Sequence, residues 1–246
     1  MSGAINNPSH IQDAYRGEEI ASRYIGDRFH SELNRVLHVS QVARVQRLLE
    51  RIGPGRALEI APGPGRLTRD IRPVGPLVCL EYNEGMIGQG RRSRGGQATW
   101  VRGDGLRLPL ASEGFDLVYS FRFVRHFRRP DRERIYAEIR RVLRPGGYFA
   151  MDAVNARVSR PLREAAPQEF PIYDELYRLD DLRREMDEVG LPLLETESVQ
   201  KFYRWQYRSQ TLLGPRADWL NRWVIRGLER MPSRDGLEWI VTCRRG

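Results

Sequence analysis

The chain has 246 residues, of which 40% are hydrophobic and 30% are charged. This balance is typical of a soluble globular protein and excludes a disordered or membrane-spanning chain. The formal net charge is +9, but Lys201 is the only lysine, so the other 40 basic residues are arginines. Because arginine replaces lysine along the whole chain, we do not take the net charge as evidence for a nucleic-acid or membrane partner.

The N-terminus and the cysteines predict the cellular compartment. The first eight residues lack the basic start and the apolar stretch of a signal peptide, and no apolar run is long enough to cross a bilayer. Cys79 and Cys243 form neither a disulfide pattern nor a metal-binding pattern. We therefore expect a cytoplasmic protein without a metal ion.

The middle of the chain alternates short apolar segments with helical patterns, which is typical of a parallel sheet covered by helices. The predicted strands, each following a turn signal, are residues 57–61, 77–81, 99–101, 115–120 and 148–152. A helix is predicted over Glu32–Ile52, ahead of the first strand, from the spacing of its apolar residues. A second helix is predicted over residues 131–143 from the same apolar spacing. It must end before Pro145, because the residue ahead of a proline disfavours helical backbone.

The C-terminal part continues the alternation. A helix is predicted over residues 180–189, ended by Gly190, followed by strands around 193–199 and 237–241. Between these strands, residues 216–230 have apolar side chains at helical spacing. We predict a single domain with an N-terminal helical cap (1–52), a central core (53–152), an insertion (153–192), and the last strands with their intervening helix (193–246).

A glycine- and proline-rich turn carries the strongest functional signal. The first strand ends on Glu59, and the turn contains Gly63 and Gly65 before a predicted helix. Glycine lets a backbone approach a ligand closely, and a helix N-terminus offers free N–H groups. The second strand ends on Glu81, which can accept both hydroxyl hydrogens of a ribose. The pattern predicts a nucleotide-like ligand at the carboxyl ends of the strands.

A dinucleotide oxidoreductase is the first alternative. Its fingerprint requires a third small residue, and Thr68 stands there. Glu59 would repel a pyrophosphate and attract an ammonium group. These two features favour an amino-acid nucleoside over NAD.

Several segments resemble the motifs of class I S-adenosylmethionine (SAM) dependent methyltransferases of the small-molecule type. They are residues 59–65, 80–87, 103–110, 114–120, 143–149 and 177–191. The resemblance covers about residues 20 to 243. It implies a three-layer α/β Rossmann-like fold, with a seven-stranded, mostly parallel sheet whose last strand is antiparallel.

The resemblance also implies a cofactor site for SAM and its product S-adenosylhomocysteine. The residues expected to bind it are Glu59, Ala61, Gly63, Gly65, Glu81, Tyr82, Met86, Asp104, Gly105, Ser120 and Phe121. By position, Glu59 would hold the methionine moiety, Glu81 the ribose and Asp104 the adenine amino group. Ala61 departs from the family's first glycine. Simpler roles stay open: Glu59 could cap a helix, Met86 could fill the core and Asp104 could serve a turn.

The acceptor side is less defined. His126, after the fourth strand, is the candidate general base, since a neutral imidazole can take a proton from a hydroxyl or an acidic carbon; a structural role is the alternative. Arg122 and Arg125 could clamp a carboxylate or phosphate. Tyr24 and Arg28 resemble a segment that folds over the cofactor, and a plain helix surface is equally consistent.

Residues 201–223 are rich in aromatic side chains interleaved with arginines. They fit a core or lid, a nucleobase-stacking surface or an interfacial membrane helix with a lipid-like acceptor. No Asn/Asp-Pro-Pro-aromatic tetrad, catalytic cysteine or carboxylate metal cluster is present at the expected places. These absences favour a small-molecule acceptor over nucleic acid.

The sequence therefore predicts methyl transfer from SAM to oxygen or carbon of a small-molecule or lipid-linked acceptor, with possible peripheral membrane contact. The alternatives are an RNA methyltransferase that uses the arginine surface and a non-catalytic SAM- or nucleotide-binding module. No motif defines the acceptor or the oligomeric state.

Overall fold

A computed structural model describes residues 31–94 and 98–246. An eight-stranded sheet forms its centre, in the order β3-β2-β1-β4-β5-β8-β7, with a two-residue β6 paired to β5 off this path. The strands are β1 Ala57–Ile60, β2 Leu77–Glu81, β3 Thr99–Arg102, β4 Phe115–Ser120, β5 Leu143–Asn155, β6 Leu176–Tyr177, β7 Leu193–Lys201 and β8 Gly236–Arg244. The seven predicted strands are all present, and β6 is the addition.

The sheet is parallel except at one strand. β1 through β6 pair in parallel wherever they are neighbours, whereas β8 runs antiparallel to both β5 and β7. The predicted antiparallel last strand is therefore confirmed. Because the parallel strands share one direction, the ends of β1, β2 and β4 meet at the same edge of the sheet.

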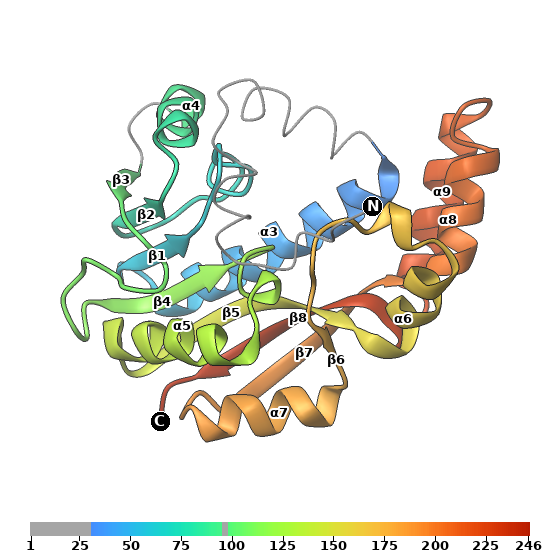
Figure 1. The fold of residues 1–246 in the computed structure, drawn as a ribbon. Helices are drawn as coiled ribbons and strands as arrows, with labels where there is room; N and C mark the ends of the chain where they lie inside the picture. The colour runs from blue at the N-terminus through green and yellow to red at the C-terminus, as the bar shows by residue number, and fades with distance from the viewer. Residues whose placement is uncertain (1–30, 95–97) are drawn as a thin grey trace.

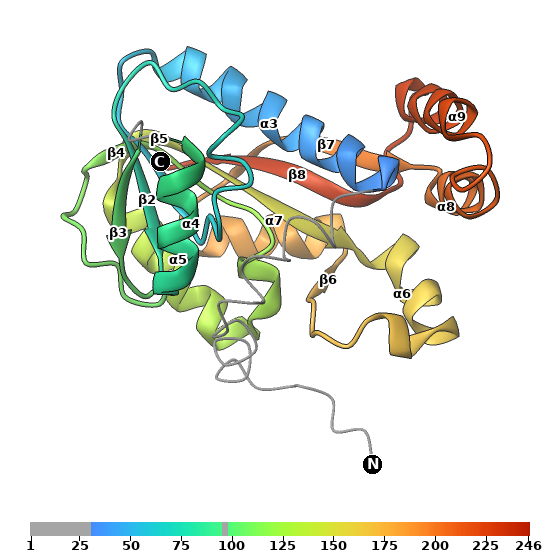
Figure 2. The same cartoon turned by 90° about the horizontal axis from the view of Figure 1, so that it is seen from above.

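Helices cover both faces of the sheet, which confirms the three-layer fold (Figures 1 and 2). They are α3 Glu32–Ile52, α4 Glu84–Arg94, η1 Val124–His126, α5 Arg129–Val142, α6 Ala156–Ala165, η2 Pro167–Glu169, α7 Leu179–Glu188, α8 Tyr203–Leu212 and α9 Asp218–Arg230. In Figure 2, α3 lies on one side of the sheet and α5 and α7 lie on the other. The α8–α9 pair stands off the end of the sheet.

Two apolar layers hold these helices to the sheet. Leu37 and Leu48 of α3 pack with Tyr119 of β4 in one layer. Ile135 of α5 and Leu182 of α7 pack against the opposite face in the other layer. All five side chains are almost completely buried, so the apolar stripes that predicted the helices are the stripes that face the sheet.

The predicted helix after the glycine-rich turn is not formed. Residues 63–70 fold as consecutive turns, with backbone bonds such as Arg69 N to Gly65 O (3.1 Å) and Asp70 N to Leu67 O (2.8 Å). Inward-facing side chains hold the segment instead: the guanidinium of Arg66 donates to Gln41 of α3 and Thr68 donates to Glu59. We attribute the missing helix to this tertiary anchoring of a short segment between proline-rich turns.

Other elements differ from the sequence prediction for local reasons. β5 begins well before residue 148, because residues 145–147 bulge out between the pairs Phe115–Leu143 and Leu117–Tyr148. α6 lies in the predicted insertion and carries Pro161 inside the helix, a position where proline is uncommon. α8 was missed because the residues it buries, Gln206 and Ser209, are polar and give no apolar stripe.

Within the described ranges, every helix is too short or too polar to span a bilayer. Tyr24 and Arg28, and most of the predicted N-terminal cap ahead of α3, lie outside those ranges.

Candidate functional site

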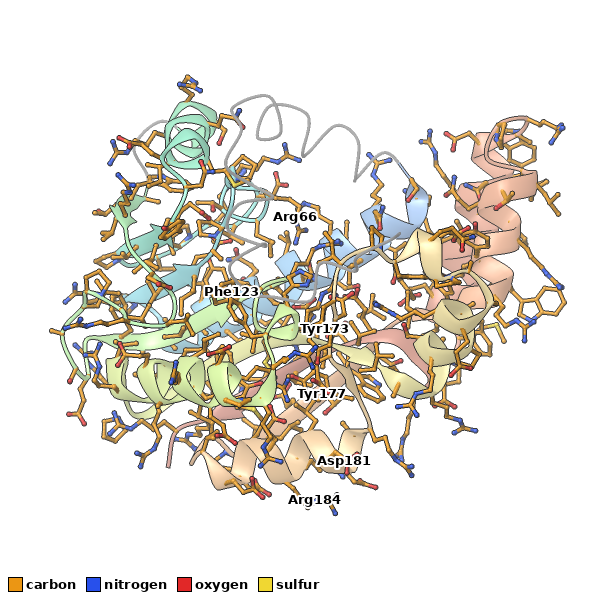
Figure 3. The ribbon with its side chains drawn as sticks, viewed as in Figure 1. Arg66, Phe123, Tyr173, Tyr177, Asp181 and Arg184 are labelled. Atoms are coloured by element: carbon orange, nitrogen blue, oxygen red, sulfur yellow. The ribbon has the colours of Figure 1, made fainter. Side chains whose placement is uncertain are left out.

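A cavity opens at the carboxyl ends of β1, β2 and β4. It is lined by Ile60, Ala61, Gly63, Leu80, Glu81, Tyr82, Asn83, Met86, Gly103, Asp104, Gly105, Arg122, Phe123, His126 and Phe127. Phe123, labelled in Figure 3, lies on the loop that follows β4. The structure thus brings together residues that are distant in the sequence but that each follow a parallel strand. We refer to this space as the first cavity.

The turn after β1 uses left-handed backbone at three positions. Ala61, Gly63 and Gly65 have φ angles of 54°, 59° and 81°. Glycine adopts this region without steric cost, whereas the Cβ of Ala61 meets its own backbone there, at a cost of about 1–2 kcal/mol. Ala61 therefore stands in strained backbone at the wall of the first cavity.

Replacing Ala61 by glycine should test this strain. We expect Ala61→Gly to leave the free energy of unfolding within about 0.5 kcal/mol of the wild type, since relieved strain offsets the lost methyl group. Ala57→Gly, in the unstrained interior of β1, should destabilise by about 1–2 kcal/mol. Urea unfolding of both variants measures the difference, and equal destabilisation would show that Ala61 is unstrained.

Glu81 joins the glycine-rich turn to the end of β2. Its carboxylate accepts the N–H of Gly63 at 2.9 Å and the N–H of Asn83 at 2.9 Å. Burial raises the pKa of Glu81, and the two backbone donors oppose this rise. Each oxygen keeps lone pairs beyond these bonds, so Glu81 can still accept hydroxyl hydrogens from a ligand in the first cavity.

Asp104 occupies the turn after β3. Its Oδ1 accepts the N–H of Leu106 at 2.9 Å, which leaves the other carboxylate oxygen to receive a donor from a ligand. The next residue is Gly105, and a larger residue does not fit there, because a Cβ would come within 2.5 Å of the ring of Phe123. The turn and the aromatic ring thus define one wall of the first cavity.

Four of the predicted cofactor residues do not line the first cavity: Glu59, Gly65, Ser120 and Phe121. Glu59 is 3% exposed and lies behind the turn, where it accepts from Thr68 Oγ1 (2.7 Å) and Tyr119 Oη (3.1 Å). Burial raises the pKa of Glu59 to about 7, although both hydrogen bonds lower it.

Ser120 and Phe121 also serve the scaffold. The Ser120 hydroxyl donates to Ile60 O at 2.8 Å and joins β4 to β1. Phe121 packs in the apolar layer under α3, near the ring of Tyr119. The next residue on the same loop, Arg122, does line the first cavity.

A second cavity adjoins the first. Its apolar and aromatic lining comes from α3, residues 170–172, α8 and β8: Leu33, Leu37, Phe170, Pro171, Ile172, Tyr203, Tyr207 and Leu237. Arg122 and His126 line both cavities. The backbone of Arg122 is left-handed, with a φ of 61°. Its N–H donates to Asp152 Oδ1 at 2.7 Å, which fixes the loop after β4 to β5.

The imidazole ring of His126 is oriented by contacts at its Nδ1 atom. Its Nδ1 lies 2.9 Å from the carbonyl oxygen of Tyr173 and 3.0 Å from Asp174 Oδ1. Because a carbonyl can only accept, Nδ1 carries the hydrogen, which makes Nε2 of the neutral ring an acceptor. Tyr173, labelled in Figure 3, comes from the segment ahead of β6. The backbone carbonyl of Tyr173 thus holds the ring, with the Asp174 carboxylate close by, and Nε2 is left as the acceptor that a general base needs.

Arg125, predicted as a clamp for an anionic substrate, lines the second cavity but not the first. Its guanidinium is 5% exposed and pairs with Asp152 (2.8 Å), Glu238 (2.7 Å) and Asp174 (3.0 Å). Burial lowers the pKa of Arg125, but these carboxylates outweigh it and raise the pKa well above the ordinary value. A group paired with three acids is not available to clamp an anionic ligand.

Sequence reasoning missed Asn83, Phe123 and Phe127 as lining residues of the first cavity. The two rings meet edge to face, 4.9 Å apart between centroids. Asn83 could have been found because it lies two residues after the end of β2. The role of Phe127 depends on the one-turn helix η1, which no spacing in the sequence predicts.

Comparison with known proteins agrees with the fold. Residues 58–151 match the family model of a methyltransferase domain. The demethylmenaquinone methyltransferase of Parafrankia sp. is 32% identical over 135 residues, which cover 46% of this chain and 52% of that protein. The sterol 24-C-methyltransferase ERG6B of Gibberella zeae is 34% identical over 108 residues, covering 41% of this chain and 28% of that protein. The chain thus spans about half or less of the length of these relatives.

A solved structure matches the chain as a whole. The magnesium protoporphyrin IX methyltransferase ChlM of Synechocystis PCC 6803, with bound S-adenosylhomocysteine, superposes with a TM-score of 0.68. The match covers 98% of this chain and all of that chain, at 12% sequence identity. At this identity the likeness concerns the fold.

Proposed function

We propose that this chain, whose residues 58–151 match a methyltransferase domain, transfers the methyl group of SAM to oxygen or carbon of an apolar small-molecule or lipid-linked acceptor. The observation that carries the proposal is that two cavities meet at Arg122 and His126. One has acids suited to a nucleoside, and the other combines an apolar and aromatic wall with polar and charged side chains. Two ligands held side by side react as an effectively unimolecular pair.

The residues of the first cavity fit SAM. The carboxylates of Glu81 and Asp104 are placed to accept the ribose hydroxyls and the adenine amino group, because each keeps acceptor capacity after its backbone bonds. Met86 is buried beside Gly63 and offers a polarisable apolar contact to a ring. The bare backbone at Gly63 lets a ligand approach the turn closely.

When bound, SAM supplies an electrophilic methyl group on a sulfonium and leaves as neutral S-adenosylhomocysteine. His126 Nε2 would receive the proton that the acceptor's hydroxyl or acidic carbon loses on methylation. The carbonyl of Tyr173 holds the ring in the required tautomer, and Asp174 stabilises the imidazolium that forms. The rings of Phe123 and Phe127 keep water from the place where the cavities meet.

The relatives support an apolar acceptor. Those compared above are named for demethylmenaquinone and for a sterol, both large apolar ring molecules. The second cavity of this chain offers matching walls in Leu33, Leu37 and Tyr203. Acceptor contacts thus extend to α3, α8 and the start of β8, well beyond the insertion over residues 153–192.

Titration with SAM tests the cofactor assignment. We expect the wild type to bind SAM and S-adenosylhomocysteine with roughly micromolar dissociation constants, and not to bind NAD. Asp104→Ala should weaken binding by about 10- to 100-fold, because a hydrogen bond to a charged group is lost. Isothermal titration calorimetry measures both.

Asp180→Ala is the matched control, since this acid is exposed on α7 and its loss should leave SAM affinity unchanged. Asp104→Asn keeps an oxygen that can accept the N–H of Leu106, so the turn should stay folded. Weaker SAM binding in this variant would therefore come from the lost carboxylate and not from a disrupted turn. Binding of NAD alone, or of neither nucleoside, would remove the basis of the proposal.

Turnover tests the acceptor class. Methyl-labelled SAM is incubated with a prenylated naphthoquinol, a sterol and a transfer RNA, and label is expected in an apolar acceptor. Label in the RNA alone, with binding that weakens steeply as salt rises, would instead identify an RNA methyltransferase. Tight SAM binding without turnover on any acceptor class would favour a non-catalytic module.

A further inference from the structure

The pair of helices α8 and α9, residues 203–230, buries polar side chains and exposes aromatic ones. The residues that the two helices bury are Gln206, Ser209, Asn221 and Ile225. Amides and hydroxyls join the helices: Ser209 bonds Asn221 at 2.9 Å, and Gln206 donates to Glu229 at 2.8 Å. We call this pair the hairpin. Its interior is held by hydrogen bonds more than by an apolar core.

The outer surface of the hairpin carries three of the five tryptophans of the chain. Trp205 is 62% exposed, and Trp219 and Trp223 are each 73% exposed. By contrast, Trp100 and Trp239 are buried. Tryptophan is the largest apolar side chain and is usually well buried, so three exposed copies on one small element mark a surface that meets an apolar phase.

The same surface is strongly basic. The hairpin contains six arginines and two acids. One acid, Glu229, is turned inward, where it accepts from Gln206 and the backbone of Lys201. Arg208 lies over the ring of Trp205, 5.5 Å from its centroid. In the part of the chain that the structure describes, Arg204 and Arg230 have no carboxylate partner.

We propose that the hairpin binds the surface of an anionic lipid bilayer. Tryptophan rings settle at the boundary between headgroups and acyl chains, and arginines pair with anionic headgroups above them. The basic charge disfavours a second copy of this chain as the occupant, because two such surfaces repel each other. Figures 1 and 2 show the hairpin at one end of the molecule, beyond the end of the sheet, where a flat surface can reach it.

The hairpin also borders the second cavity. Tyr203, Tyr207 and Gln210 of α8 line that cavity from its inner side. A bilayer on the outer side of α8 would therefore lie next to the wall of the cavity. This inference goes beyond the proposed function and needs neither SAM nor an acceptor for its test.

Vesicle sedimentation and tryptophan fluorescence test the inference. The full chain is mixed with vesicles of phosphatidylcholine containing about one-third phosphatidylglycerol, or with phosphatidylcholine alone. We expect binding to the anionic vesicles, a blue shift of the emission, and weaker binding as NaCl rises from about 0.1 to about 0.5 M. The blue shift comes from the hairpin, since Trp100 and Trp239 are already buried.

Two hairpin variants and one control give the test its specificity. Trp205→Ala, Trp219→Ala and Trp223→Ala together should reduce binding by about tenfold or more and remove the blue shift. Arg204→Gln, Arg208→Gln and Arg230→Gln together should also reduce binding by about tenfold or more. The control removes three exposed arginines from α5 and α7, at Arg134, Arg183 and Arg184, and should leave binding within about twofold.

Three results would overturn the proposal. The wild type could stay in the supernatant with anionic vesicles, or bind them equally well without the three tryptophans. A dimer in light scattering that the tryptophan variant dissociates, without vesicle binding, would make the hairpin an interface between copies. SAM titration of the same variants separates these failures from failure of the proposed function, because vesicle binding does not depend on the cofactor.

Discussion

Replacing His126 by glutamine is expected to lower kcat for methyl transfer by about 100- to 10,000-fold, with little change in the dissociation constant of SAM. Glutamine keeps a polar side chain at the junction of the cavities but cannot take a proton at neutral pH. The measurement is steady-state turnover with the acceptor that the labelling assay identifies, together with SAM titration of the same variant. Loss of kcat without loss of SAM binding would assign the proton transfer to this side chain.

A matched histidine provides the control. His38 of α3 is also partly buried, where it pairs with Asp70 at 2.7 Å, and it lines neither cavity. His38→Gln should therefore keep kcat near that of the wild type. A kcat within about threefold of the wild type in His126→Gln would exclude a general base at this position.

Replacing Glu59 by glutamine is expected to remove a pH-dependent change of about 3 kcal/mol in the free energy of unfolding. Burial raises the pKa of Glu59 to about 7, above its ordinary value of 4.5. The folded protein thus holds this proton more tightly than the unfolded chain does. The stabilisation is complete below pH 4.5 and is lost as the pH rises to about 7. Glutamine has no such proton, so the wild type should lose this stability relative to Glu59→Gln between about pH 5 and 8.

Urea unfolding of ligand-free wild type and Glu59→Gln at several pH values measures this difference. A second variant sharpens the test. Thr68 donates to the carboxylate of Glu59 at 2.7 Å and lowers its pKa, so Thr68→Val should move the decline in stability to higher pH. A wild-type curve that stays parallel to the Glu59→Gln curve across the whole range would mean that Glu59 is not buried as described.

The strands and the acids at their ends could be predicted from the sequence. Alternating apolar runs and turn signals predicted β1, β2, β4 and the helix α3 closely, because these elements are stabilised by the side chains that carry the pattern. Glu81 is the last residue of β2 and Asp104 lies two residues after β3, so their arrival at one edge of the parallel sheet follows from the topology alone.

Side-chain direction within those motifs was decided only by the tertiary structure. Glu59 stands at the expected strand end, but its carboxylate turns to Thr68 and Tyr119, which come from the turn and from β4. Arg125 is one residue from His126, yet three buried acids from β5, β8 and the segment ahead of β6 hold it. Such partners are distant in the sequence, and no local period records them.

For the second cavity and the hairpin, too, the sequence predicted the composition and the tertiary structure decided which side chains face outward. The sequence by itself determined the aromatic and arginine content of residues 201–223, and it left a core or lid, a nucleobase-stacking surface and a membrane surface open. Only the packing of α8 on α9 through Gln206, Ser209 and Asn221 decided that Trp205 and its neighbours face outward. The physical reason is that an apolar period identifies a buried face only when the buried side chains are apolar. Here hydrogen-bonded amides fill the interior, and the apolar side chains are left to the surface.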